Sequence, residues 1–368
     1  MPQPQRPDVL TALDWAARVE ARSRLLLSWP RQRDVRYGDR VAVRTDLRDT
    51  ELPERLFPHT PGRTLLDLAI RPGRSRSSAD VTVLGVMRAK HLRSRSFYLS
   101  GFRQRRGPLT LAVHERAPGN AGAPLLVGAQ VAREAHGRIG LEVPQVLDLG
   151  GLQEPRGTGA VDWVLEEVVD GAPIPPDEAA EAVPQLLAGV AELWELREVS
   201  HTPLPAKTAA GAARALQRLD ELGPDLELWP EDVDRPRLVR RALSVLEDRP
   251  VLTYGLTHGD PGFGNALRLP DGRVALLDWE HAQERHLCHD AMKVLAAPGI
   301  DPATWPDRMP SLPGISGAPA TSQLAVATLL FLGGWESRTR RAAARGAQVA
   351  DRQRVGRLLR AVQALLDD

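Results

Sequence analysis

The sequence lacks several features that would assign it to a specialised class of protein. Only one of its 368 residues is a cysteine, Cys288, so the chain can form neither an internal disulfide nor a four-cysteine zinc site. Its longest apolar-rich run, from Leu324 to Trp335, is shorter than the roughly 20 residues that a membrane helix needs. The first residues contain no apolar core of signal-peptide length. These absences favour a cytoplasmic protein that does not span a membrane.

Positive charge is also not in excess. The chain has 48 basic and 47 acidic residues, a net charge of +1, so we expect no nucleic-acid partner and no binding to an anionic membrane. Only three of the basic residues are lysines, namely Lys90, Lys207 and Lys293. Any mechanism that requires a lysine therefore has three candidates.

The chain is longer than one average domain of roughly 100–200 residues, and its composition is that of a globular protein. Residues 71–78 have the composition of a linker, which places a boundary between a mixed N-terminal module over residues 1–78 and a strand-rich unit over residues 79–167. Helical periodicity dominates residues 168–368, with a strand-rich segment at residues 251–281. The predicted fold class is α+β, with a β-rich lobe, a helical lobe and an extra N-terminal module whose role the sequence does not indicate.

Periodicity also predicts the individual elements. In the β-rich lobe we expect an antiparallel meander, a helix that begins at Pro124, and two further strands. The expected strands cover residues 81–87, 96–102, 109–113, 143–149 and 161–169. The expected helices of the second lobe cover residues 178–195, 207–222, 235–246, 322–345 and 350–366.

The segment 251–281 carries the residues that could take part in catalysis. Asp271-Gly272 between apolar runs predicts a two-residue hairpin turn, and that register places Asn265 opposite Asp278. An amide oxygen and a carboxylate are hard ligands, which Mg²⁺ takes when it also binds substrate phosphates. Asp260 would lie beside that metal, where it could orient a hydroxyl group and accept its proton. These residue types match what phosphoryl transfer requires.

The same residues form a recognisable signature. The run His258-Gly-Asp260 is followed by Asn265 and then by Leu277-Asp278-Trp-Glu280, which resembles the signature of the aminoglycoside phosphotransferase and choline kinase family. The resemblance implies a two-lobed, protein-kinase-like fold from about residue 80 to the end of the chain.

The resemblance also implies roles for individual residues. Asp260 would be the catalytic carboxylate, and Asn265 and Asp278 would be magnesium ligands. Glu280 would join the outer shell of the metal or face the substrate. His258 would support the loop, and Asp290 would tie down the catalytic segment from the start of a helix.

The nucleotide side of the resemblance contains one departure. Residues Glu166 to Val168 correspond to the hinge whose backbone holds an adenine ring. The third strand of the family carries a lysine or arginine that touches phosphates and pairs with a glutamate on the next helix. Here the strand carries His114 and Arg116, which lie on the same side of an extended chain, and Glu134 is the candidate partner. Either the nucleotide is bound in a different way or the catalytic activity is low.

The leading hypothesis is a magnesium-dependent enzyme that transfers the γ-phosphoryl group of ATP or GTP to a hydroxyl of a small molecule. Two alternatives stay open. One is a kinase-like pseudoenzyme that binds a nucleotide or a partner without turnover, because the third-strand lysine is missing. The other is a kinase for serine or threonine in a peptide, with residues 1–78 or the C-terminal helices as the docking surface.

Arginines are concentrated near the C-terminus. We expect this arginine-rich end to be a solvated helix face. If it instead faced the substrate, a polycationic acceptor would be disfavoured. The residues are Arg338, Arg340, Arg341, Arg345, Arg352, Arg354, Arg357 and Arg360.

Overall fold

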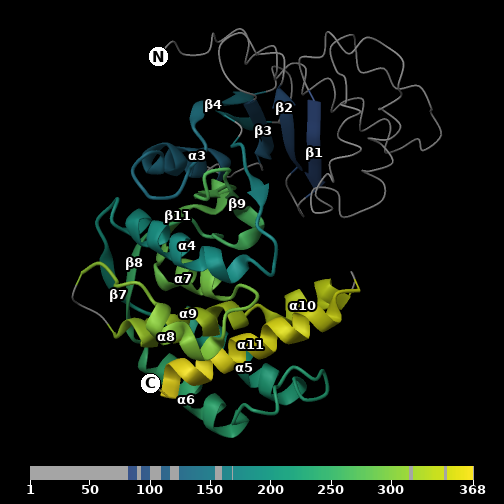
Figure 1. Cartoon of the computed structure of the whole chain (residues 1–368). Helices are drawn as coiled ribbons and strands as arrows, with labels where there is room; N and C mark the ends of the chain where they lie inside the picture. The colour runs from purple at the N-terminus through teal and green to yellow at the C-terminus, as the bar shows by residue number, and fades with distance from the viewer. Residues whose placement is uncertain are drawn as a thin grey trace, which may run out of the picture. The chain divides into compact units, whose positions relative to one another are not determined.

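The structure is a computed structural model that describes most of the chain from residue 82 onward. The described ranges are 82–88, 93–99, 109–116, 124–153, 160–167, 169–314, 318–343 and 346–367. The predicted N-terminal module over residues 1–78 lies outside them. Two compact units divide the chain, one reaching to Arg133 and including Pro144–Val169, the other comprising Glu134–Val143 and the residues from Asp170 onward (Figure 1).

The first unit contains a five-stranded sheet in the order β1-β2-β3-β5-β4, with every neighbouring pair antiparallel. Helix α3 (Pro124–Ala135) follows β3 in the chain and begins at the predicted proline. The meander of the first three strands is confirmed. The strands are β1 (Thr82–Arg88), β2 (Arg93–Leu99), β3 (Leu109–Arg116), β4 (Val146–Gln153) and β5 (Ala160–Glu167).

The second unit is mainly helical and carries two small sheets, in the orders β10-β9-β6 and β11-β8-β7. Its strands are β6 (Ala172–Pro173), β7 (Ser200–Pro203), β8 (Val251–Thr257), β9 (Ala266–Arg268), β10 (Val274–Leu276) and β11 (Gln283–His286). Its α-helices are α4 (Ala179–Trp194), α5 (Ala206–Leu222), α6 (Arg235–Asp248), α7 (Cys288–Leu295), α8 (Trp305–Arg308), α9 (Ala320–Leu332), α10 (Trp335–Ala343) and α11 (Gln348–Asp367). Short 3-10 turns are η2 (Phe263–Asn265), η3 (Trp279–His281) and η4 (Pro302–Thr304).

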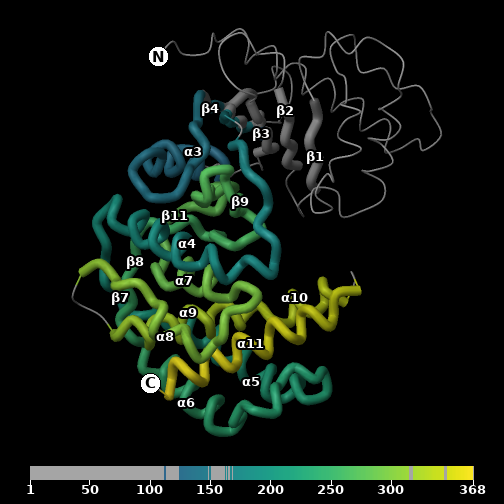
Figure 2. The backbone as a smooth tube through the Cα atoms, viewed as in Figure 1, coloured from purple at the N-terminus to yellow at the C-terminus, as the bar shows by residue number. Residues whose placement is uncertain are grey.

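Helix α9 forms the centre of the helical core. Its residues from Gln323 to Leu329 are all buried, so the helix has no solvent-facing side along this stretch. It contacts α5, α7 and α11, and Figure 2 shows its path between α7 and α11. This packing fixes α7, which carries Asp290 and Lys293. No helix among the described residues is long and apolar enough to cross a membrane.

The single helix predicted over residues 322–345 is wrong, because the described part of this range forms two helices, α9 and α10, that separate at Gly333 and Gly334. Glycine destabilises a helix interior, and a Cβ on Gly334 would lie 2.7 Å from a guanidinium nitrogen of Arg338. The break lets Trp335 turn inward, where it is 2% exposed and its Nε1 donates to the carbonyl of Ala215 at 3.0 Å. The tryptophan thereby anchors the start of α10 to α5.

The predicted two-residue hairpin turn is also wrong. The Gly272 N–H donates to the Leu269 carbonyl at 3.0 Å, and the Leu269 N–H donates to the Arg273 carbonyl at 2.8 Å, which closes a three-residue loop. Of the loop residues only Gly272 has a positive φ, at 85°. Pro270 favours the first central position of a type I turn, and Gly272 supplies the left-handed residue that follows it. Every pair in the hairpin is therefore shifted by one residue from the predicted register.

Candidate active site

The loop that follows β8 is held by the carboxylate of Asp290 in the first turn of α7. One oxygen of this carboxylate accepts from the backbone N–H of His258 at 2.6 Å, and the other accepts from that of Gly259 at 2.9 Å. Asp290 and His258 are both fully buried. Burial raises the pKa of Asp290 to about 7, although both N–H donors favour its charged form. The core of the second unit thus fixes the backbone immediately before Asp260.

The His258 ring links this loop to the hairpin. Its Nε2 lies 3.0 Å from the Leu277 carbonyl, which only accepts, and its Nδ1 lies 3.3 Å from the backbone N–H of Asp260, which only donates. The ring is therefore the neutral tautomer with its proton on Nε2. Burial lowers the pKa of His258 to about 4, so the ring stays neutral at physiological pH. Trp279 packs against it edge to face, with ring centres 4.6 Å apart.

Gly259 satisfies a steric requirement of this loop. Its φ is 85°, and a Cβ at this position would lie 2.2 Å from the carbonyl oxygen of His281. A side chain would require both a strained backbone and displacement of the neighbouring segment.

Both oxygens of the Asp260 carboxylate have donors. Lys293 Nζ donates to Oδ1 at 2.8 Å, and the Asn265 amide donates to Oδ2 at 3.3 Å and to the Asp260 backbone carbonyl at 2.9 Å. Desolvation raises the pKa of Asp260, but the hydrogen bond and charge of Lys293, with smaller effects of His281 and His258, lower it below its ordinary value. The Asp260 side chain remains 37% exposed, so a substrate can approach an ionised and oriented carboxylate.

The corrected hairpin register changes how Asn265 and Asp278 are related. The N–H of Leu277, not of Asp278, pairs with the Asn265 carbonyl at 2.7 Å. Asp278 follows directly, in a left-handed conformation with φ 65° and ψ 61°. Such a conformation costs energy for a residue other than glycine, and it is found preferentially at functional sites.

Among the described residues, no donor reaches the Asp278 carboxylate or the Asn265 Oδ1. Asp278 is exposed at the surface, yet partial desolvation by the surrounding protein raises its pKa, and the negative charge of Asp260 adds to this rise. Desolvation and the charge of Asp278 likewise raise the pKa of Glu280, against the lowering effect of His281. Three acidic groups therefore lie within electrostatic reach of one another, and a cation would relieve their repulsion.

These oxygens fit Mg²⁺ better than a metal held entirely by protein. The described part of the chain contains no group of three or more His, Cys, Asp or Glu residues placed to hold a metal ion. Mg²⁺ commonly takes only one or two protein oxygens, and substrate phosphates and water complete its shell. The Asn265 Oδ1 and the Asp278 carboxylate are donors of that kind.

The predicted nucleotide-binding residues belong to the first unit, except for Glu134. In β3, His114 pairs with Ser94 and Asp162, and Arg116 pairs with Ala160. The side chains of His114 and Arg116 lie outside the part of the chain that the structure describes. Glu166 lies within β5, where it pairs with Thr110 and Val146, and Val168 is outside the described residues.

Glu134, the predicted partner of the β3 cation, forms an ion pair with Arg197, with Nη2 and Oε2 2.7 Å apart. A contact of Glu134 with the side chains of His114 or Arg116 stays a prediction. Glu134 is the only acidic residue of α3 and lies in its last turn, while the buried face of the helix is formed by leucine, valine and alanines. A partly exposed carboxylate at that position faces a surface arginine.

Lys293 is the residue that motif reasoning missed. It lies three residues after Asp290 in α7, a spacing that puts both side chains on one face of a helix. Because Asp290 was already expected to contact the catalytic segment, this spacing was the available signal. Lys293 is also one of only three lysines in the chain.

The chain is similar to known proteins at the level of a family model and of solved structures. Residues 128–314 match the model of the phosphotransferase enzyme family, abbreviated APH. An apo structure of a thermostable mutant of aminoglycoside phosphotransferase APH(4)-Ia is similar, with 18% identity, coverage of 76% of this chain and 95% of that chain, and a TM-score of 0.44.

Two further solved structures are similar at the same level. An aminoglycoside phosphotransferase from Alicyclobacillus acidocaldarius has 15% identity, coverage of 77% of this chain and 91% of that chain, and a TM-score of 0.45. A glucosamine kinase has 16% identity, coverage of 77% and 87%, and a TM-score of 0.40. A search among curated protein sequences found no match.

Proposed function

Because the chain belongs to the phosphotransferase enzyme family, we propose that it transfers the γ-phosphoryl group of ATP or GTP to a hydroxyl group of a small molecule. Family membership makes it a kinase-type phosphotransferase with an α+β, kinase-like architecture, and the donor and the acceptor are the proposed part. One observation carries the proposal. The Asp260 carboxylate is oriented by Lys293 and Asn265, and the nearby Asn265 Oδ1 and Asp278 carboxylate accept from no donor in the part of the chain that the structure describes.

Asn265 and Asp278 are assigned as the residues that would hold Mg²⁺. The bound ion would neutralise the phosphates of the nucleotide. Glu280 adds negative charge next to Asp278 and is assigned to the outer shell of that ion. The hairpin fixes Asn265, and η3 fixes the two acids, so the ligands belong to neighbouring rigid turns.

Asp260 is assigned as the catalytic carboxylate. Its lowered pKa makes it a weak base that is ionised at neutral pH, which suits a reaction with little bond formation at the transition state. In such a reaction the carboxylate mainly orients the acceptor hydroxyl and receives its proton as the phosphoryl group moves. Lys293 holds Oδ1, so the hydroxyl approaches a carboxylate with a fixed orientation.

His258 and Asp290 are assigned as positioning residues. Neither is accessible to a substrate, and their hydrogen bonds end on the backbone of the loop and of the hairpin. They hold Asp260 and Leu277 in fixed positions relative to α7.

On the nucleotide side, Arg116 and His114 of β3 are proposed contacts for phosphates. Arg116 is the stronger candidate of the two, because a guanidinium binds phosphate in a bidentate manner and keeps its charge. The backbone of Glu166 to Val168 is proposed to hold the base.

The test is phosphoryl transfer from γ-labelled ATP and GTP to a panel of hydroxyl compounds, with Asp260→Asn as the variant. We expect the variant to lose transfer by about a hundredfold or more while it still binds nucleotide. Asp271→Asn, which alters an exposed carboxylate at the tip of the same hairpin, is the control and should retain activity. Wild-type protein that binds nucleotide and transfers nothing would instead support a pseudoenzyme.

A further inference from the structure

Three cations from three helices surround the ring of Phe331 at the end of α9. Lys293 Nζ of α7 lies 4.9 Å from the ring centre, Arg338 Cζ of α10 lies 4.2 Å from it, and Arg354 Cζ of α11 lies 5.1 Å from it. We call Lys293, Arg338 and Arg354 the Phe331 cluster. Stacking on an aromatic face stabilises each cation, but it does not cancel the repulsion between them.

The two arginines of this cluster have no acidic partner among the described residues. Other arginines of the same region are paired: Arg218 with Glu336, Arg352 with Glu227, and Arg360 with Asp232. One terminal nitrogen of Arg338 is fully buried and has no hydrogen-bond acceptor in the described ranges.

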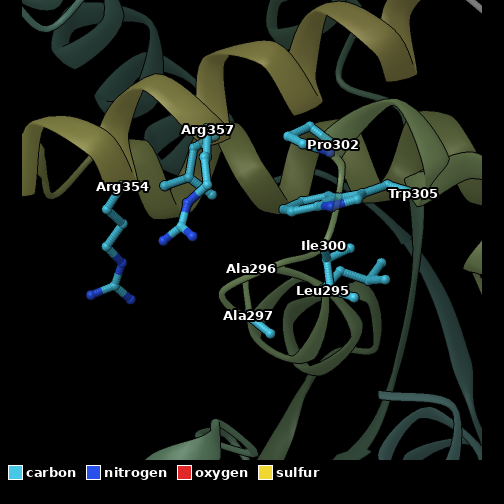
Figure 3. A pocket seen from close by; sticks show the side chains of 9 residues that line it. Leu295, Ala296, Ala297, Ile300, Pro302, Trp305, Arg354 and Arg357 are labelled. Carbon is cyan, nitrogen blue, oxygen red and sulfur yellow. The ribbon is translucent and has the colours of Figure 1, made fainter. Parts of the chain in front are cut away.

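The pKa of Arg338 shows that its charged form is destabilised. Burial, together with the charges of Arg354 and Arg341, lowers the pKa of its guanidinium to about 10, against the opposing charge of Asp351. Burial and the charge of Arg354 also lower the pKa of Arg357, the next arginine along α11. Figure 3 shows Arg354 and Arg357 extending from α11 to the same side, and both line a pocket together with Leu295, Ile300 and Trp305. The region is thus a partly buried concentration of uncompensated positive charge.

Buried donors in proteins are nearly always hydrogen-bonded, and unpaired buried charges are strongly unfavourable. A planar guanidinium presents a fork of donors that matches a carboxylate or a phosphate. An anion between Arg338 and Arg354 would supply the missing acceptor and the missing countercharge.

The cluster lies next to the proposed reaction centre. Lys293 contacts both the Phe331 ring and the Asp260 carboxylate, so the path of contacts from the two arginines to Asp260 runs through the Phe331 ring and the Lys293 side chain. Asn265 and Asp278, which mark the phosphates of the nucleotide in the proposed function, belong instead to the hairpin and η3. The arginines of α10 and α11 therefore belong to the acceptor side of Asp260.

We propose that the acceptor of this enzyme is an anionic hydroxyl compound, whose carboxylate or phosphate binds Arg338 and Arg354 while its hydroxyl group meets Asp260. This assignment rests on the proposed function and adds to it the chemical class of the acceptor. A polycationic acceptor is excluded by the same charges.

The test measures binding of two probes, malonate and inorganic phosphate, to the full-length protein by calorimetry at constant ionic strength. The variant is Arg338→Gln with Arg354→Gln, which should weaken binding of at least one probe by about tenfold or more. The matched control is Arg340→Gln on the same helix, an exposed arginine without an acidic partner among the described residues, which should bind as the wild type does. Equal binding by wild type and double variant would overturn the proposal, as would equal weakening in the control.

A second arm separates the acceptor from the nucleotide as the source of the anion. The probe is titrated again with the protein saturated by Mg²⁺ and a non-hydrolysable ATP analogue, and we expect it to bind alongside the analogue. Competition between them would assign the arginines to the nucleotide phosphates and overturn the proposal. Spermidine serves as the cationic probe, and its binding in preference to malonate would overturn it too.

Loss of folding is kept apart from loss of binding by a conservative variant. Arg338→Lys keeps the charge and removes the fork of donors, so it should bind the probes with intermediate affinity in a folded protein. An unfolding transition measured for Arg338→Lys and for Arg354→Gln shows whether each variant is folded. Wild-type affinity for the probes in both folded variants would contradict the assignment. Since probe binding needs no turnover, a failure of Asp260→Asn to lose transfer would reject the proposed function without changing the binding result.

Discussion

Lys293 Nζ donates a hydrogen bond to Asp260 Oδ1 over 2.8 Å, although the two residues are 33 positions apart in the chain. The contact joins α7 to the loop after β8, and Asp290 of the same helix binds the backbone of that loop. One helix therefore fixes both the path of the loop and the charge state of its carboxylate. Lys293 is also the point at which the proposed catalytic site meets the Phe331 cluster.

Lys293→Met should reduce kcat and move the acidic limb of its pH profile upward. In the wild type Lys293 offsets the desolvation of Asp260 and keeps the pKa of Asp260 below its ordinary value. Without that charge, desolvation raises the pKa, so the carboxylate becomes protonated at a higher pH as acid is added. We expect kcat at neutral pH to fall by about tenfold. The measurement is a pH–rate profile of phosphoryl transfer.

Lys207→Met is the matched control for this experiment, because Lys207 lies exposed at the start of α5. It should leave both kcat and the acidic limb unchanged. A Lys293→Met enzyme with an unshifted profile would show that Lys293 does not set the ionisation of Asp260.

Gly259→Ala and Gly272→Ala form a pair that isolates one steric contact. Both glycines have φ 85°, so alanine pays the same backbone penalty at each position, about 1–2 kcal/mol. A Cβ on Gly272 meets no atom within 4 Å, whereas a Cβ on Gly259 would lie 2.2 Å from the His281 carbonyl oxygen. Gly259→Ala should therefore lower the free energy of unfolding by about 1–3 kcal/mol more than Gly272→Ala does.

Denaturant unfolding of both alanine variants measures this difference. Gly259→Ala should also lose activity, because the clash displaces the residue next to Asp260, while Gly272→Ala should remain active. Equal destabilisation by the two substitutions would contradict the close approach of Gly259 and His281.

The half-buried His286 is expected to make the fold sensitive to acid. Burial, with help from the charges of His289 and Arg285, lowers its pKa to about 3, below the ordinary value of 6.5 that applies in the unfolded chain. Between these two values the unfolded chain binds a proton that the folded chain does not. The free energy of unfolding therefore falls as the pH decreases below about 6.5 and is not affected by this group above it.

His286→Phe keeps a ring beside Tyr254 and cannot be protonated. It should reduce the pH dependence of stability between pH 6 and pH 4 by about one proton, or ~1.4 kcal/mol per pH unit. The measurement is denaturant unfolding at several pH values in this window. An unchanged slope would show that His286 is protonated equally in the folded and unfolded chains.

The sequence predicted the helices and strands better than it predicted the register of the hairpin and the long-range contacts. Pro124 marked the start of α3, and alternating apolar residues marked the strands of the meander, because both signals are local. The turn after β9 was misjudged because Pro270 selects a type I turn, which the Asp-Gly pair alone does not reveal. The site residues still converge, since the one-residue shift leaves Asn265 paired with the neighbour of Asp278.

Long-range charge contacts were not available from the sequence. A solvated face was expected for the arginine-rich end. This expectation holds for Arg340 and Arg360, which are exposed. It does not hold for Arg338, whose position depends on the helix break at Gly333 and Gly334 and on the ring of Phe331. The ion pair of Glu134 with Arg197 is a contact of the same kind, since Arg197 reaches Glu134 only through the tertiary fold.

The most direct test of the account is the binding of Mn²⁺, in place of Mg²⁺, together with a non-hydrolysable ATP analogue, followed by electron paramagnetic resonance. The account predicts tight, nucleotide-dependent Mn²⁺ binding that weakens by about tenfold or more in Asn265→Ala and in Asp278→Asn and survives in Asp271→Asn. Wild-type Mn²⁺ binding in both Asn265→Ala and Asp278→Asn would contradict it.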